Sequence, residues 1–474
     1  MKTRLITSAV IITLLLAVPG VFAQPGGLDP LDSKALSQLQ TALKQDGFEV
    51  SFGRAEAWNA TAEWCEGKVD SAQGFNNEPY LQVLVPKSAQ EPGYPALTGE
   101  FRLRQNEAIV LIGLTPPPVK YFSYTPYLFT RLYPDGKKSI FASLGDQLNN
   151  AVIKSIGDSP FNSPVALIFT PDQGTDSRIR EALRRAGYPT AIVNTVVFPA
   201  AMLKLGLTET ADVLRIVTRT AVWEDKTAAT AYTNNPPLKV LRVTPLAEAP
   251  AKPFPTPLLR IRGTGQTEMG LANKLDELRQ GIIAAYPGLH ATDIQSIPMC
   301  YEGYDLIQRG NWCGDSRDAF YIGAGYLGYA TSDPASTDLT LGDDEFLMVY
   351  GVNHVATGKA TYMNLNFYAD KQAQLFVGSL SDSEFPAAAP GYLPGDPAAD
   401  VLYAYKVSRH CNEGETYCLP LSPPEGCTRL KLDSGTVLTV FDRIYLEPAT
   451  KVGPAMPEIL YDRVIKFSPR APQP

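Results

Sequence analysis

The sequence predicts an α+β protein, in which a ferredoxin-like α/β sandwich is followed by a β-rich, disulfide-fastened C-terminal domain. Three observations carry this prediction. Strand and helix patterns alternate as β-α-β-β-α-β between residues 165 and 243. Short strand patterns separated by turns fill the chain beyond residue 297, and six cysteines, an even number, follow a segment typical of secretory signal peptides.

The segment Met1–Ala23 has the three parts of a secretory signal peptide. It begins with basic residues, continues with the apolar run Leu5–Val18, and ends in the small-residue cleavage pattern Val21–Ala23. An uncleaved anchor is the alternative, but the apolar run is short for a bilayer and Pro19 interrupts the helix. We therefore expect a secreted or periplasmic protein that folds outside the reducing cytosol.

Composition limits the partners of the mature chain. Removal of 23 of the 474 residues leaves 451, too many for one ordinary core, and takes the formal net charge from −7 to −9 because the leader carries two basic residues. An acidic chain without a basic run argues against nucleic acid and anionic membranes as partners. No later apolar run reaches 18 residues, so we expect a soluble product with no membrane contact after cleavage. The oligomeric state stays open.

The range 24–135 is predicted to be an N-terminal α+β region. Leucines spaced by three or four residues predict a helix over Ser33–Asp46, with Ser33 as its N-cap. Apolar runs predict strands at Tyr80–Val85 and Ala108–Gly113, and the aromatic stretch Val119–Tyr133 is expected to be extended.

The range 136–246 is predicted to be the ferredoxin-like domain. Its elements are a strand at Val165–Thr170, a helix at Asp176–Ala186, strands at Ala191–Phe198 and Asp212–Trp223, a helix at Lys226–Tyr232 and a strand at Leu238–Val243. This order predicts one four-stranded sheet with both helices on the same face.

The range 247–257 is the predicted linker, because four prolines in eleven residues form a stiff spacer. The range 258–474 is the predicted C-terminal domain. It opens with an amphipathic helix over Met269–Tyr286. Its strands are predicted at Phe346–Tyr350, Ala360–Tyr368, Gln374–Val377, Val401–Val407, Thr436–Leu446 and Arg463–Phe467.

The cysteines are expected to form three disulfides and to leave no free thiol. Spacing favours local pairs Cys300–Cys313 and Cys411–Cys418, which leaves Cys65 to pair with Cys427 across the chain. Fifteen pairings of six cysteines exist, so this choice among them is a hypothesis. A zinc site of cysteine type needs CxxC spacing or clustered histidines, and the sequence has neither, so we expect no metal and no cofactor.

His354 is one of only three histidines and is predicted to lie between two strands. It is a candidate general base, while ligation of a metal or haem by His354 or His410, with help from the acids at 343–345, is an alternative. In the alternative, structural interpretation, His354 is a loop residue whose side chain is hydrogen-bonded to the backbone. Lys359, shortly after His354, is a candidate for binding a substrate anion or carbonyl group.

Asp315, Arg317 and Asp318 concentrate charge beside a predicted disulfide. Two carboxyl groups with an arginine between them can separate into a general acid and a general base. The alternative is a charge network that closes an irregular loop. We expect His354 to lie near Asp315 or Asp318, with Arg317 binding substrate.

Two further segments have both a functional and a structural interpretation. Arg260–Glu268 contains a glycine turn before a helix, which can bind an anion or simply cap the helix. The stretch Tyr121–Phe129, with Tyr121 and Tyr124, can line a pocket for a ring-bearing or carbohydrate ligand, or form a half-buried strand.

Taken together, these patterns favour an exported enzyme of hydrolase or lyase type that uses acid–base catalysis by His354, Asp315 and Asp318. A non-catalytic extracytoplasmic protein that binds a small molecule or glycan through Tyr121 and Tyr124 is the alternative. A haem or metal protein is a third possibility. The substrate is not specified by any motif in the sequence.

Overall fold

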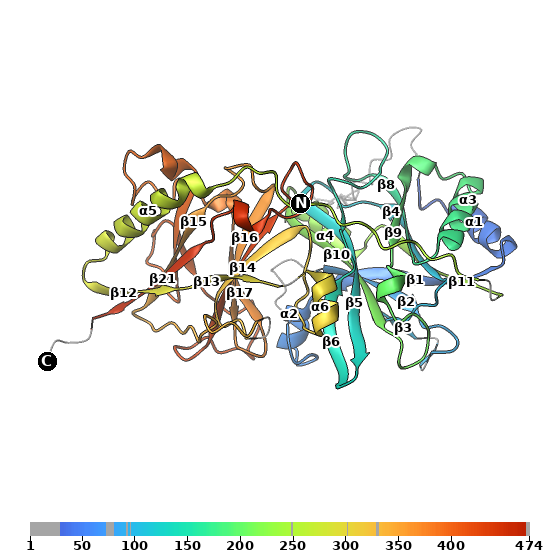
Figure 1. Cartoon of the computed structure of the whole chain (residues 1–474), viewed down its shortest axis with the longest axis horizontal. Helices are drawn as coiled ribbons and strands as arrows, with labels where there is room; N and C mark the ends of the chain where they lie inside the picture. The colour runs from blue at the N-terminus through green and yellow to red at the C-terminus, as the bar shows by residue number, and fades with distance from the viewer. Residues whose placement is uncertain are drawn as a thin grey trace, which may run out of the picture.

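The computed structural model describes residues 29–470 except 73–79, 92, 95, 248–249, 301 and 329–330, so the predicted signal peptide lies outside the described residues. Two halves lie side by side along the long axis of the molecule (Figure 1). The N-terminal half, residues 29–246, runs from blue to green, and the C-terminal half, residues 258–470, runs from yellow-green to red.

The described N-terminal half contains one eleven-stranded sheet in the order β6-β5-β10-β2-β1-β11-β4-β8-β9, with β3 paired to β2 and β7 to β5. Its elements are α1 (Ser33–Gln45), β1 (Phe48–Trp58), α2 (Ala60–Cys65), β2 (Tyr80–Pro86), β3 (Leu97–Thr98), β4 (Ala108–Leu114), β5 (Val119–Tyr133), β6 (Gly136–Ser143), β7 (Leu148–Asn149), β8 (Pro164–Thr170), α3 (Gln173–Arg185), β9 (Val193–Val197), β10 (Val213–Trp223), α4 (Lys226–Asn234) and β11 (Leu238–Pro245).

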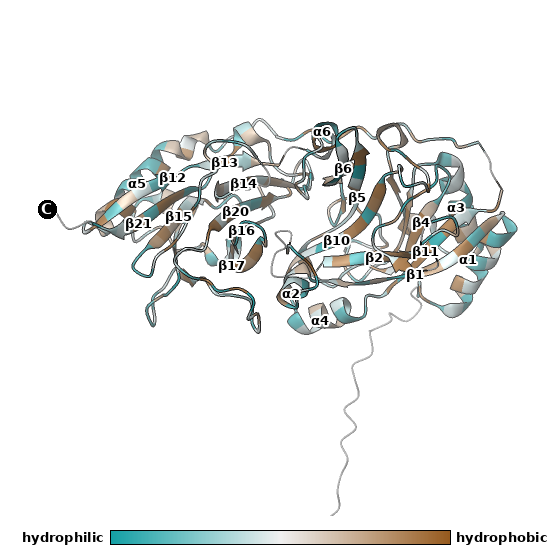
Figure 2. Cartoon of the chain, turned by 90° about the horizontal axis from the view of Figure 1, so that it is seen from below, coloured by the Kyte–Doolittle hydropathy of each residue, from teal (hydrophilic) through white to brown (hydrophobic). Residues whose placement is uncertain are grey.

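Local sequence explains most of these elements. Asp32, one residue before the expected cap, accepts a hydrogen bond from the backbone N–H of Ala35 and starts α1. Leu39 and Leu43 of α1 pack with Leu183 of α3 over one face of the sheet. Figure 2 shows β4, β5 and β10 largely hydrophobic and the outer helices α1 and α4 largely polar or pale. The β5 strand has the bounds expected for the aromatic stretch.

The ferredoxin-like topology is not confirmed. The four strands expected to form it, β8 to β11, do not make a separate sheet: β4 lies between β8 and β11, and β1 and β2 lie between β11 and β10. Strands from the range 24–135 thus supply the hydrogen-bond partners that a four-stranded sheet would have supplied internally. The expected boundary at 135/136 falls in the β5–β6 hairpin of the same sheet.

The C-terminal half is β-rich. Its elements are a 3₁₀ turn at Met269–Leu271, α5 (Ala272–Ala285), β12 (Leu289–Ile294), β13 (Ser296–Met299), α6 (Gly303–Arg309), β14 (Ala319–Gly325), β15 (Phe346–Val352), β16 (Tyr362–Ala369), β17 (Leu375–Ser381), β18 (Leu402–Ser408), β19 (Cys418–Pro420), β20 (Leu438–Tyr445) and β21 (Arg463–Pro469). Two five-stranded sheets, β12-β21-β15-β18-β19 and β13-β14-β20-β16-β17, enclose a common core between them. The helix α5 covers the outer face of the first sheet.

Each half contributes a segment to the core of the other. From the N-terminal half, Trp64 and Ala72 belong to the core of the C-terminal sandwich. From the C-terminal half, Leu306 and Ile307 of α6 belong to the core of the large sheet, and α6 lies beside β6 in Figure 1. The two halves are therefore interlocked as well as linked.

The structure contains the three expected disulfides, Cys65–Cys427, Cys300–Cys313 and Cys411–Cys418, and no free cysteine among the described residues. The first of these bonds joins the two halves across 362 residues of sequence. Within the part of the chain that the structure describes, no helix has the length and apolar character needed to cross a membrane.

Candidate functional site

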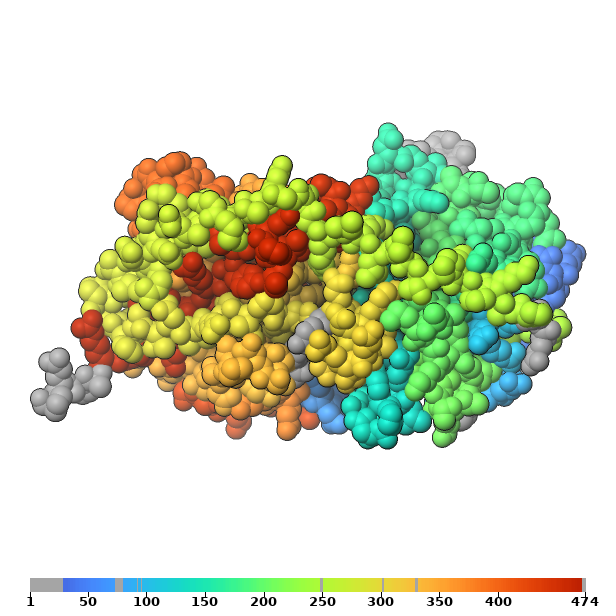
Figure 3. Space-filling view, in the orientation of Figure 1, coloured from blue at the N-terminus to red at the C-terminus, as the bar shows by residue number. Residues whose placement is uncertain are grey.

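An open cleft lies on the C-terminal half where α5, β12 and the segment before β21 meet. Its volume is about 1010 Å³, and its walls carry the charged side chains of Arg279, Asp293 and Arg463. Asp462 also lines it. In Figure 3 the red surface near residue 460 lies between the yellow-green surface of the α5 region and the yellow surface of the residues that follow.

His354 lies behind this cleft, in the turn that follows β15. Asn353 fixes the turn, because its side-chain oxygen accepts hydrogen bonds from the backbone N–H groups of Val355 and Ala356. His354 Nδ1 is 2.9 Å from both carboxylate oxygens of Glu268. The ring is fully buried at 0% exposure, so its other nitrogen, Nε2, points into the protein interior.

Glu268 is held in place from three sides. Besides His354, it accepts hydrogen bonds from Thr357 Oγ1 at 2.5 Å and from the backbone N–H of Leu460 at 3.0 Å. Burial by itself would raise the pKa of Glu268, but the nearby His354 and these hydrogen bonds outweigh burial and bring the pKa below its usual value. An ionised Glu268 therefore accepts a hydrogen bond from the Nδ1–H group of His354 and orients the imidazole, so that Nε2 faces away from Glu268.

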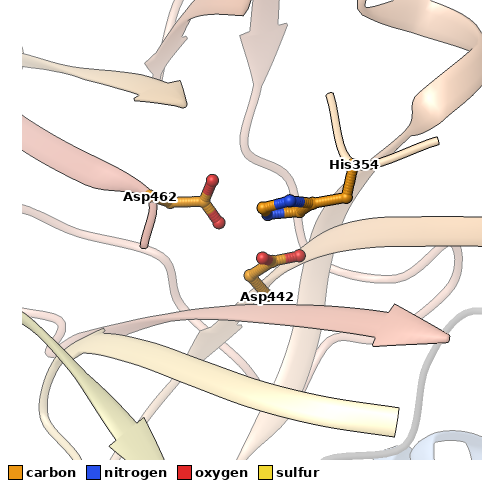
Figure 4. A group of neighbouring side chains, drawn as sticks. All are labelled: His354, Asp442 and Asp462. Atoms are coloured by element: carbon orange, nitrogen blue, oxygen red, sulfur yellow. The ribbon is translucent and has the colours of Figure 1, made fainter. Parts of the chain in front are cut away.

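Two aspartates face His354, one from each of the two sheets of the C-terminal half. Asp442 comes from the middle of β20 and Asp462 from the residue before β21, and both point toward the imidazole in Figure 4. One ligand atom from each of the three side chains lies within 4.8 Å of the other two. Asp442 is 2% exposed and Asp462 is 3% exposed, so this group, here called the His-Asp-Asp cluster, is buried.

Tyr403 and Gly351 position Asp462. The Tyr403 hydroxyl donates a hydrogen bond of 2.5 Å to Asp462 Oδ1, and its ring stacks on Phe385 with centroids 4.0 Å apart. Gly351 faces the same place from β15, where a Cβ would collide with Asp462 Oδ1. The glycine is therefore required for the close approach of the carboxylate to the strand.

The two aspartates of the cluster disfavour each other's charge. Burial is the largest cause that raises the pKa of Asp442 well above its usual value, and the charge of Asp462 adds to it. Burial also raises the pKa of Asp462. Burial and the proximity of the two carboxyl groups therefore favour protonation of the cluster unless a positive charge compensates.

Asp315 and Asp318 do not join His354, contrary to the expectation from the sequence. The segment before β14 runs along β6, where Cys313 and Gly314 donate backbone hydrogen bonds to Ile140 and Phe141. It therefore carries both aspartates to the interface with the N-terminal half. Asp315 accepts two hydrogen bonds from Ser143 there, and Asp318 accepts from Tyr121 and Asn149.

Arg317 and Lys359 are both buried in ion pairs. Arg317 pairs with Asp146 at 2.7 Å and also with Glu302. Lys359 pairs with Glu447 at 2.7 Å and with Glu458 at 2.6 Å. Each cation already has two carboxylates, so neither presents a free charge to the cleft.

The glycine turn of Arg260–Glu268 binds an anion that belongs to the protein itself. The backbone N–H groups of Thr264 and Gly265 donate to the Glu458 carboxylate at 3.0 and 2.6 Å. Burial by itself would raise the pKa of Glu458. Lys359 and the two backbone donors outweigh burial and lower this pKa to about 2. The turn is therefore occupied by an internal partner.

The aromatic stretch forms the buried strand β5. Tyr121 is 1% exposed and contacts the C-terminal half, with its ring 4.6 Å from that of Tyr445. Tyr124 is 0% exposed and belongs to the core on the opposite face of the sheet. The two tyrosines therefore face different surroundings, as alternation along a strand dictates.

The remaining candidate ligands lie on the surface. His410 is 74% exposed in its side chain and lies 3.9 Å from Asp343. Asp343 pairs with Arg409, and Glu345 pairs with Lys466. Neither acid belongs to the His-Asp-Asp cluster.

Comparisons with known proteins give no name to the site. No family model matches the sequence, and no curated protein matches it. Among solved structures, the VPA0106 protein from Vibrio parahaemolyticus is similar at 11% identity and a TM-score of 0.38, over 92% of this chain and all of that one. The N-terminal CBM22 tandem domain of Paenibacillus barcinonensis Xyn10C aligns over 90% of this chain and 94% of that one, at 9% identity and a TM-score of 0.13. Likenesses this distant do not bear on function.

Proposed function

We propose that the protein is an exported hydrolase whose active site is the cleft of the C-terminal half. One observation carries the proposal: Asp462 lines the cleft and also belongs to the His-Asp-Asp cluster. Buried polar groups with perturbed pKa values beside a cleft of ligand size are typical of catalytic sites. The three predicted disulfides agree with export.

The composition of the cluster favours hydrolysis. An imidazole nitrogen and two carboxylates directed at one point can bind a water molecule and accept its proton during attack on a substrate. Arg279 and Arg463 stand on the cleft wall, each paired with an exposed aspartate, Asp293 and Asp276. Because these pairs are solvent-exposed and weak, an anionic group of the substrate can take over the arginines.

A panel of chromogenic p-nitrophenyl esters, phosphates and glycosides tests the proposal on the purified mature protein. We expect turnover of at least one class, and a loss of ~100-fold or more in kcat/KM for His354→Ala and Asp462→Asn. Asp338→Asn is the control, since Asp338 is 54% exposed and pairs with Lys371 at the surface.

Equal rates for Asp462→Asn and Asp338→Asn would refute the assignment of the site. Failure of the wild-type protein to hydrolyse any class would remove the support for an enzyme. A non-catalytic binding protein would then be the better description.

A further inference from the structure

The atoms at the centre of the His-Asp-Asp cluster have no hydrogen-bond partner. Among the residues that the structure describes, this holds for His354 Nε2, both carboxylate oxygens of Asp442 and Asp462 Oδ2. Each of these atoms is buried, and burial of a polar group without a partner is unfavourable, more so when the group is charged. Four such atoms around one point indicate that a further group belongs between them.

The charge of the cluster identifies the kind of group. With both carboxyl groups ionised and the imidazole neutral, as metal ligation requires, the cluster carries a formal charge of −2 in a buried site. A divalent cation balances this charge and gives each unpartnered atom a partner. A water molecule has only two protons to donate to these four acceptor atoms, and it would leave the charge of two adjacent carboxylates uncompensated.

The surrounding residues match those of a metal site. Ligating histidines in proteins usually donate their other ring N–H to a carboxylate, as His354 Nδ1 does to Glu268 at 2.9 Å. Ligating carboxylates are in turn hydrogen-bonded, as Asp462 is to Tyr403 at 2.5 Å. The shell around the cluster thus fixes the tautomer of His354 and the rotamer of Asp462.

We propose that His354 Nε2, Asp442 and Asp462 bind one zinc ion, and that this ion is the water-activating group of the proposed hydrolase. The inference deepens the proposed function and rests on it for the role of the ion, although binding can be tested separately. Three N and O ligands from the protein, with water or substrate in the fourth position, are typical of catalytic zinc.

The ligand set favours zinc over the common hard cations. Calcium takes six to eight oxygen ligands, and magnesium keeps most of its waters and avoids imidazole. Ligand atoms about 2.1 Å from a tetrahedral ion lie about 3.4 Å apart. The atoms of the cluster lie within 4.8 Å of one another, so each separation has to shorten by at most about 1.4 Å to match this geometry.

Bound zinc lowers the pKa of its water ligand to about 7, which supplies hydroxide at neutral pH. That hydroxide would form the new bond to the electrophilic atom of the substrate while the bond to the leaving group breaks. The proton released by the water would pass to solvent, and the leaving group would take up a proton from solvent. Asp462 is the member of the cluster that also lines the cleft, so it is the ligand expected next to the substrate.

The test uses the mature protein purified without chelator. Elemental analysis should find about one zinc per chain. After dialysis against a chelator, added zinc sulfate should bind with a Kd below 1 µM and raise Tm. Asp442→Asn should weaken binding at least 100-fold, whereas Asp318→Asn should bind as the wild type does. Asp318 is the matched control because it is also a fully buried aspartate but lies at the interface between the halves.

A second variant covers the case in which Asp442→Asn does not fold. Tyr403→Phe removes only the hydroxyl, keeps the ring on Phe385, and should weaken zinc binding 10–100-fold. The inference is overturned if the wild-type protein binds no zinc. It is also overturned if the protein binds calcium or manganese more tightly than zinc. Equal zinc affinity in the wild type and both variants also overturns it.

The two proposals fail in different ways. Zinc bound without any hydrolytic turnover would support the metal site and refute the hydrolase. Turnover that is undiminished in metal-free protein would support the hydrolase and refute the metal site.

Discussion

Asp318 is a buried carboxyl group whose ionisation should destabilise the interface between the two halves. Its oxygens accept hydrogen bonds from Tyr121 at 2.9 Å and from Asn149 at 2.8 Å. Burial is the largest influence and raises the pKa of Asp318 to about 7, although both hydrogen bonds lower it. Asp318→Asn keeps the shape of the side chain and removes the charge.

The sign of the effect follows from linkage. An aspartate has a pKa of about 3.9 in the unfolded chain, so the folded protein binds the proton more tightly. The stabilisation from the protonated group is complete below about pH 4 and is lost as the pH rises to about 7. A shift of about three pKa units corresponds to about 4 kcal/mol as an upper limit.

Thermal unfolding between pH 4 and pH 8 measures this difference. At pH 8 we expect Asp318→Asn to unfold at a Tm a few degrees above that of the wild type, since 1 kcal/mol is worth about 1 °C in a chain of this size. At pH 4 the two proteins should unfold at nearly the same Tm. Asp315, whose burial raises its pKa to about 6, keeps part of the pH dependence in both proteins.

Parallel Tm profiles for the two proteins across this pH range would refute the reasoning. A variant less stable than the wild type at pH 8 would refute it as well. The asparagine amide would then be a poorer partner for Tyr121 and Asn149 than an ionised carboxylate.

Two further predictions concern the connection between the halves and the geometry of the cluster. Replacement of both Cys65 and Cys427 by serine should lower the free energy of unfolding by about 5–6 kcal/mol, because this disulfide closes a loop of 362 residues. Replacement of Cys411 and Cys418 should lower it by only about 2–3 kcal/mol, because their sequence separation is 7. Unfolding in urea measures both losses, and equal losses would contradict the entropic argument. Gly351→Ala should displace Asp462 and weaken zinc binding at least 10-fold with little change in far-UV circular dichroism, and an unchanged zinc affinity would contradict the close approach.

The local sequence pattern was sufficient to predict which segments are helices and which are strands. It was not sufficient to predict which strands are neighbours in the sheet. The alternation and aromatic content over Val119–Tyr133 predicted an extended segment, and β5 has those bounds. The order β-α-β-β-α-β was also read correctly between residues 164 and 245. The sheet order was not, because β1, β2 and β4 are inserted by long-range pairing that leaves no local periodicity.

The site was predicted in part. The rarity of histidine singled out His354, but Asp442 and Asp462 were missed because no cluster of polar residues marks them. The sequence does contain a signal for Asp442. It lies two residues from both Val440 and Ile444 in β20, so its side chain is on the same face of the strand as these two buried apolar side chains. The polar Asp315–Asp318 segment was more conspicuous, yet its charges join the two halves.

Because each half contributes a segment to the core of the other, the two halves should stay together even when the backbone linker between them is cut. Leu258, next to the proline-rich stretch, is 97% exposed and thus open to a protease. A chain cut there would still be one covalent particle through Cys65–Cys427. Reduction would leave two polypeptides that each hold a piece of the other's interior, Trp64 on one side and Leu306 on the other. Neither fragment expressed alone would contain a complete core, whereas co-expression would supply both.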